Sequence, residues 1–120
     1  MKVKEIMWLD ESILEAEVRI SDGNYELVCF SQPLRYKVNE VIEEPLYCLD
    51  VANIQRIAGE FKVVKLEGVF SYQIVAKLSD KKQGMFKLGG IYLEVDDGII
   101  PKDIQENEFV VLNCSRIDIF

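Results

Sequence analysis

Near its start the chain reads Leu14-Glu15-Ala16-Glu17-Val18-Arg19-Ile20-Ser21-Asp22-Gly23-Asn24-Tyr25-Glu26-Leu27-Val28-Cys29-Phe30, and this stretch decides the fold. Apolar residues recur at every second position on both sides of the Asp-Gly pair, as in strands that bury one face. The Asp-Gly pair favours a type I′ turn, because both central residues of that turn need positive φ. The stretch therefore predicts a β-hairpin in which Ile20 faces Tyr25 and Val18 faces Leu27.

The outer face of this hairpin combines acids with large apolar side chains. In the predicted register Arg19 lies opposite Glu26, which is a favourable cross-strand pair. Acids that surround large apolar side chains are typical of an interaction patch with a charged rim. The alternative is that another segment, for example around Trp8 or Phe61, covers the apolar side chains, and Trp8 itself is expected in the core. The candidate interaction face consists of Glu15, Glu17, Glu26, Val28 and Phe30.

Alternation continues in the second half of the chain. A second hairpin is predicted from Phe70 to Val95, with a polar loop at residues 80–84 and a bend at Gly89-Gly90. The last strand is predicted from Glu108 to Phe120. Its apolar residues change phase near Ser115-Arg116, which indicates a bulge there.

The remaining segments give weaker patterns. Asp50 to Gly59 has an N-cap residue, apolar residues at helical spacing and a terminal glycine, so a short helix is expected there. Lys2–Leu9, Val41–Leu49 and Phe61–Leu66 are expected to be strands or extended segments. The count is six to eight strands with at most one short helix.

The segment from Phe70 to Phe120 resembles the OB fold, because a long hairpin with a Gly-Gly bend leads through a polar turn at residues 100–108 into a closing strand. Asn107-Glu108 stands where a Gly-Asp pair is commoner in such barrels. The ending is also similar to that of OB-fold-like β-barrel domains in small uncharacterised bacterial proteins. We therefore expect one all-β, mainly antiparallel domain over residues 1–120, either a small OB-like barrel or a curled sheet.

The resemblance implies an alternative function, which is binding of an oligonucleotide or an oligosaccharide. Single-strand binders stack bases on exposed aromatic rings beside cations. The residues that could form such a face are Arg35, Tyr36, Lys37, Lys81, Lys82, Phe86 and Lys87.

Composition argues against catalysis and against nucleic acid. The 120 residues contain no histidine, which removes the usual general base and the commonest transition-metal ligand. Neighbouring carboxylates such as Glu43-Glu44 and Asp96-Asp97 fit solvated acids and turns better than a metal site, since adjacent strand residues point to opposite faces. The net charge of −7 repels phosphate backbones and favours cationic partners. We expect no enzyme activity, no cofactor and no metal.

Cysteine usage and hydropathy indicate the compartment. Cys29, Cys48 and Cys114 are odd in number and widely spaced, so they are expected to be free and buried rather than disulfide-bonded. No apolar run reaches the roughly 20 residues of a membrane-spanning helix, and the start lacks a signal-peptide pattern. A cytoplasmic, non-enzymatic protein-interaction module, of the immunity type that masks a basic partner, is the functional expectation, while the oligomeric state stays open.

Overall fold

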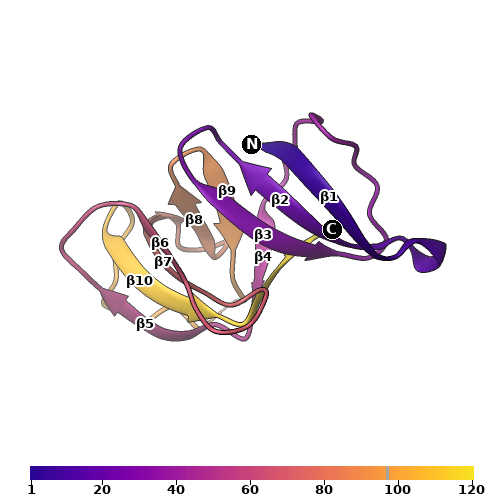
Figure 1. The fold of residues 1–120 in the computed structure, drawn as a ribbon. Helices are drawn as coiled ribbons and strands as arrows, with labels where there is room; N and C mark the ends of the chain where they lie inside the picture. Colours follow the sequence, from indigo (N-terminus) through magenta and orange to yellow (C-terminus); the bar gives the residue numbers. More distant parts are fainter. Residues whose placement is uncertain (97) are drawn as a thin grey trace.

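A computed structural model describes residues 1–96 and 98–120 as an all-β protein (Figure 1). Asp97, of the Asp96-Asp97 pair that the sequence assigns to solvated acids and turns, lies outside these residues. The fold class is confirmed, but eleven strands in the described residues exceed the six to eight expected. The strands are Lys2–Asp10 (β1), Glu15–Ser21 (β2), Glu26–Ser31 (β3), Leu46–Leu49 (β4), Ala52–Arg56 (β5), Lys62–Lys65 (β6), Tyr72–Asp80 (β7), Met85–Leu88 (β8), Ile91–Glu94 (β9), Phe109–Cys114 (β10) and Arg116–Ile119 (β11), and a single 3₁₀ turn spans Glu11–Ile13 (η1).

All strands belong to one curled sheet in the order β1-β2-β3-β11-β4-β9-β8-β7-β10-β5, with β6 paired to β7. Most pairs are antiparallel, while β3 with β11 and β4 with β9 are parallel. The strands β10 and β11 are consecutive in the chain but lie far apart in this order, so the strands between them must curve round. The sheet is not closed into a barrel, because its path ends at β1 and β5.

The first hairpin forms, but its register differs from the predicted one by two residues. Ile20 pairs with Leu27 and Val18 with Cys29, so the apolar set still faces the core. The turn is a longer loop because the Asp22 carboxylate caps it. Its Oδ1 accepts hydrogen bonds from the backbone N–H groups of Asn24 (2.9 Å) and Tyr25 (2.7 Å).

Gly89-Gly90 is a hairpin turn between β8 and β9, not the predicted bend within one strand, since Leu88 pairs with Ile91. Gly89 has a φ of +58°, which favours glycine. The Gly90 N–H donates to Asp22 Oδ2 at 2.6 Å. A Cβ on Gly89 would lie 2.7 Å from Asp22 Oδ2 and 2.9 Å from the Tyr25 ring. Asp22 thus joins two turns that lie far apart in the sequence.

The predicted helix at residues 50–59 is wrong. Asp50 and Asn53 have positive φ, and the segment forms β5 along the free edge of β10, where Val110 pairs with Arg56. A helix of two turns is marginal in isolation, and the strand edge supplies hydrogen bonds that it lacks. The segments predicted to be extended contain β1, β4 and β6.

The last strand confirms the predicted change of phase. Val110, Leu112 and Cys114 of β10 are buried, and after Ser115 the buried positions resume at Ile117. The Ser115 N–H donates to the Leu49 carbonyl at 3.0 Å, which holds the chain where it leaves β7 for β4. Ile119 at the end of β11 is buried too. The side chains from both halves of the strand therefore enter the same core.

The core is one cluster that most strands share. Its largest fully buried side chains include Phe86, Leu93 and Ile20. All three cysteines are free and buried, as predicted. Pro33, Pro45 and Pro101 lie outside the strands, where a residue without an N–H costs no sheet hydrogen bond.

Replacing Gly89 tests the close approach of the two turns. Gly89→Ala should lower the free energy of unfolding by about 3 kcal/mol, because an alanine pays for left-handed φ and also collides with Asp22 and Tyr25. Gly59→Ala is the matched control, since nothing lies within 4 Å of its added Cβ and its φ is not positive. Denaturant unfolding measures both. Equal stability of the two variants would contradict the packing of the turns.

The pH dependence of stability tests the Asp22 carboxylate. Burial raises the pKa of Asp22, but hydrogen bonds from Tyr25, Gly90 and Asn24 together lower it below the ordinary value. A lowered pKa means that the stabilisation is present above the unfolded-state pKa of about 3.9 and is lost as the pH falls through the folded-state pKa. Asp22→Asn should cost about 1.5 kcal/mol at pH 7, since its amide cannot accept every N–H. The difference between wild type and variant should shrink below about pH 4, and a difference that is constant from pH 7 to pH 2 would exclude this role.

Candidate interaction face

The acidic face, defined as Glu15, Glu17, Glu26, Val28 and Phe30, lies on the side of β2 and β3 that points away from the core. Ala16, Val18 and Cys29, which alternate with these residues, are fully buried. Glu17 lies directly opposite Phe30 in the ladder. The two-residue change of register leaves all five residues on one side, because side chains alternate with a period of two. The predicted set is therefore brought together.

Part of this face is covered, and the segment after Phe61 takes part, because Val63 and Lys65 of β6 line a hollow together with Val28. The Phe70 ring packs edge-on against the Phe30 ring with centroids 6.0 Å apart, and the Arg116 guanidinium carbon lies 4.3 Å from the Phe30 centroid. The Tyr72 hydroxyl accepts a hydrogen bond from the Val28 N–H at 2.8 Å. Val28 and Phe30 stay half-buried. The covering residues come from β6, β7, β11 and the β6–β7 connection.

Neither Trp8 nor Phe61 performs the covering role. Trp8 pairs with Ala16, which places it on the opposite side of the sheet. Its exposed fraction of 40% corrects the expectation that it lies in the core. Phe61 instead packs against the rings of Tyr25 (6.1 Å between centroids) and Phe109 (5.2 Å).

The electrostatics of the acidic face favour a positively charged partner. Arg116 is held by both Asp118 carboxylate oxygens, at 2.7 and 3.0 Å, so its charge is already matched. Arg19 lies 4.0 Å from Glu26 in an exposed pair, which contributes little. Glu15 and Glu17 have no ion pair among residues 1–96 and 98–120. These two carboxylates are therefore available to a partner.

An exposed apolar region that the sequence reasoning did not assign adjoins the acidic face. Met7 pairs with Glu17 from the edge strand β1 and is 56% exposed. Beyond it the chain leads through η1 at the end of the β1–β2 hairpin (Figure 1), where Leu9, Ile13 and Leu14 are exposed. The apolar run Met7-Trp8-Leu9 was visible in the sequence. Strand alternation alone, however, does not reveal that β1 is an edge strand of the sheet, where these side chains stay exposed.

The residues proposed for a nucleic-acid face do not form one groove. Phe86 is fully buried, so it cannot stack on a base, and this corrects its assignment. It belongs to the inward-pointing set of β8, whereas its neighbour Lys87 is exposed. Arg35, Tyr36 and Lys37 lie in the β3–β4 connection, while Lys81 and Lys82 lie in the turn between β7 and β8.

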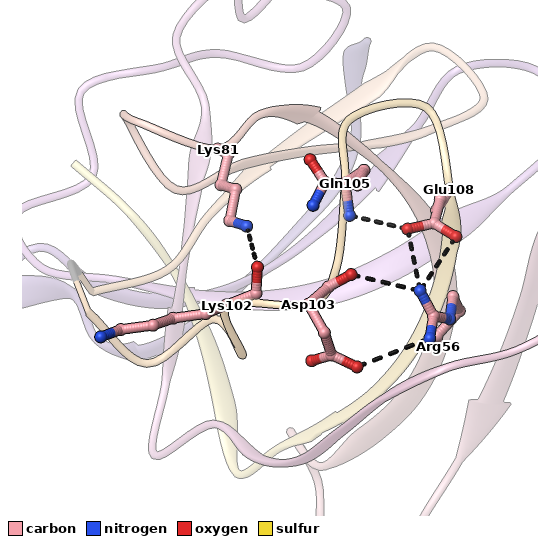
Figure 2. A network of polar contacts seen from close by, with 6 residues as sticks. All are labelled: Arg56, Lys81, Lys102, Asp103, Gln105 and Glu108. Carbon is pink, nitrogen blue, oxygen red and sulfur yellow. Dashed lines mark hydrogen bonds and ion pairs between the residues drawn. The ribbon is translucent and has the colours of Figure 1, made fainter.

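A polar network holds the connection between β9 and β10 (Figure 2). Arg56 of β5 donates to the Asp103 carbonyl (3.2 Å) and to the Glu108 carboxylate (3.4 Å), and Glu108 also accepts the Gln105 N–H at 2.7 Å. The Lys81 ammonium donates to the Lys102 carbonyl at 2.7 Å. Asp103, Glu108 and Lys81 are thus engaged within the chain.

Metal-ligating side chains, a phenol and the thiols are the groups to consider for chemistry in the described residues. No group of three or more metal-ligating side chains occurs in residues 1–96 and 98–120. The hydrogen bond from Tyr47 to Asp96 raises the pKa of the Tyr47 hydroxyl to about 12, so that phenol stays protonated near neutral pH. Burial raises the pKa of the Cys29 thiol, and this disfavours its nucleophilic thiolate. The hydrogen bond with Cys48 instead lowers the pKa of the Cys114 thiol, which is also buried.

Comparisons with protein-family models, curated proteins and solved structures found no match for this chain. Over the described part of the chain, no helix has both the length and the apolar character needed to cross a membrane.

Thiol labelling tests the burial of the cysteines. The folded protein should resist DTNB at pH 8, because all three thiols are buried and a reagent reaches them only after opening. In denaturant all three should react at once. Rapid labelling of any thiol under native conditions would show that the core near that cysteine is accessible.

Proposed function

We propose that this chain is a cytoplasmic, non-enzymatic protein-interaction module, and that its acidic face binds a basic partner in the manner of an immunity protein. One observation carries the proposal. Glu15 and Glu17, which form no ion pair within the described part of the chain, lie beside half-exposed Val28 and Phe30 on one side of the sheet, and the exposed Met7 extends the same surface.

The two kinds of side chain have different roles in this proposal. Apolar groups such as Phe30 and Met7 lose water when a partner covers them, and burial of such anchors supplies most of the binding energy of an interface. Carboxylates at the rim steer a cationic surface toward the face and reject acidic ones. The net charge of −7 extends this steering beyond the face itself. A complementary partner therefore presents a binding surface with an apolar centre surrounded by lysines or arginines.

The non-enzymatic part of the proposal rests on residue types. A chain without histidine lacks the side chain that most often moves protons near neutral pH. Its three thiols are buried in the core, away from a substrate in solution, and the Tyr47 hydroxyl stays protonated near neutral pH.

Charge reversal on the acidic face tests the proposal. The tagged double variant Glu15→Lys/Glu26→Lys should lose a basic protein that the wild-type chain captures from extract of its native cells. The loss should reach at least about tenfold in recovered partner, as expected when rim carboxylates are replaced by repulsive cations. Quantitative mass spectrometry of the captured proteins measures it.

The control is Glu43→Lys/Glu44→Lys, which makes the same change of charge at exposed positions before β4. It should retain the partner. Crosslinks from the partner should map to the acidic face, and higher salt should weaken capture. Equal loss in both variants, or crosslinks confined to other surfaces, would overturn the assignment of the face.

A further inference from the structure

Two lysines lie directly opposite each other on the outer side of the sheet, away from the acidic face. Lys77 of β7 pairs with Lys87 of β8. The same row continues to Tyr92 on β9 and to Phe109 on β10, which pair with Lys87 and Lys77 respectively. Like charges directly opposite in a ladder destabilise a sheet. The arrangement is therefore unexpected in a chain with more acids than bases.

Neither ammonium is neutralised within the described chain. Lys77 Nζ lies 5.2 Å from the centroid of the Phe109 ring, and Lys87 Nζ lies 6.0 Å from that of Tyr92. No salt bridge to either lysine occurs in residues 1–96 and 98–120, although Arg19, Arg56 and Arg116 all have one. The nearby Glu108 is engaged by Arg56 (Figure 2). Two cations are left to bind an external anion.

Both lysines line a pocket of about 450 Å³. Ser79 and Asn107 line it together with Lys77, Lys87 and the Phe61 ring. Gly89 also lines the pocket, and the Asp22 carboxylate lies against Gly89 without itself belonging to the lining, where its oxygens accept backbone N–H groups. Asn107 has a φ of +72° and donates its N–H to the Leu78 carbonyl at 2.8 Å, so this wall of the pocket is fixed by the backbone. The site thus combines two cations, two neutral polar groups and one aromatic ring, in a volume typical of small-ligand sites.

We propose that this pocket binds a nucleoside phosphate. The two ammonium groups lean over rings on opposite neighbouring strands, Phe109 of β10 and Tyr92 of β9, so both side chains turn toward each other when they bind. The phosphate then lies between Lys77 and Lys87, where charge-assisted hydrogen bonds also offset the repulsion of the pair. The hydroxyl of Ser79 and the amide of Asn107 supply further polar contacts. The base packs against Phe61, since every base presents a flat face to an aromatic ring. A free nucleotide and one nucleotide of a single strand present the same chemistry.

The acidity of the whole chain does not prevent this binding. Solvent-exposed charges farther than a Debye length of about 10 Å at 0.1 M salt are largely screened. Cations inside the pocket therefore act on a bound phosphate more strongly than distant carboxylates do. The proposal concerns another surface than the acidic face and does not depend on the function proposed for that face.

The test measures binding of a fluorescent ten-residue oligothymidylate and of uridine monophosphate at low salt, with anisotropy for the first and calorimetry for the second. In Lys77→Gln/Lys87→Gln the dissociation constant should rise at least about tenfold, because two charge-assisted contacts are lost. Lys2→Gln/Lys4→Gln is the matched control for net charge and should stay within about twofold of wild type. Oligonucleotide binding should fall with salt along a log–log slope of about −0.7, as expected when one phosphate of a single strand is neutralised.

Folding and base recognition are read out separately. Removing a repulsive pair should leave the melting temperature of the Lys77→Gln/Lys87→Gln variant at or above that of wild type. Phe61→Leu should weaken nucleotide binding but leave inorganic phosphate binding unchanged. Equal affinity for the two nucleotide probes identifies a free nucleotide as the source, and preference for the oligonucleotide identifies a single strand.

Three results would overturn the proposal. The first is no binding of either probe at any salt concentration from about 20 mM to 0.1 M, the upper end being where exposed charges beyond about 10 Å are screened. The second is an equal loss of binding in the Lys2→Gln/Lys4→Gln control. The third is tighter binding of an acidic peptide than of both nucleotide probes, which would assign the two lysines to a protein partner.

Discussion

The architecture depends on the single bend at Ser115. The residues before it pair with β7 and β5, and those after it pair with β4 and β3. Within the described chain, β11 is the link in the hydrogen-bonded path between β1–β3 and the other strands. The Ser115 N–H and hydroxyl both reach the Leu49 carbonyl, which compensates the ladder bonds lost at the bend. β11 thereby joins strands β1–β3 and the remaining strands into one curled sheet.

Asp22 provides a second connection between those two sets of strands, and it acts through backbone groups. Its carboxylate accepts N–H groups from its own turn and from Gly90 of the β8–β9 turn. The Tyr25 ring lies against Gly89 and packs on Phe61. The same contacts that join the two hairpins therefore position the Phe61 ring, which lines the pocket of Lys77 and Lys87. The acidic face remains on the outer side of β2 and β3, so the two proposed sites share a support without sharing residues.

Sequence patterns correctly predicted which side of the sheet a side chain points to, because that depends only on the two-residue period of a strand. They failed for strand register and for the choice between helix and strand, which depend on contacts with segments distant in the sequence. Alternation correctly placed Glu17 and Phe30 on one side, because side-chain direction repeats every two residues whatever the register. It could not choose between two registers that differ by two residues, since that choice follows from the Asp22 carboxylate and its partner Gly90. The helix expected near Ile54 became a strand because the edge of β10 was available. The pairing of Lys77 with Lys87 was likewise invisible, since it requires the register of β7 and β8.

Net charge and local charge carry different information in this chain. The excess of acids sets the field felt at long range, and this governs which partners approach and how fast. At the surface, cross-strand pairing decides which charges are neutralised. Arg116 lies within hydrogen-bonding distance of Asp118, whereas Lys77 faces another lysine and an aromatic ring. Because screening confines exposed charges to short range, an acidic protein can hold a cationic pocket, and composition alone does not exclude an anionic ligand.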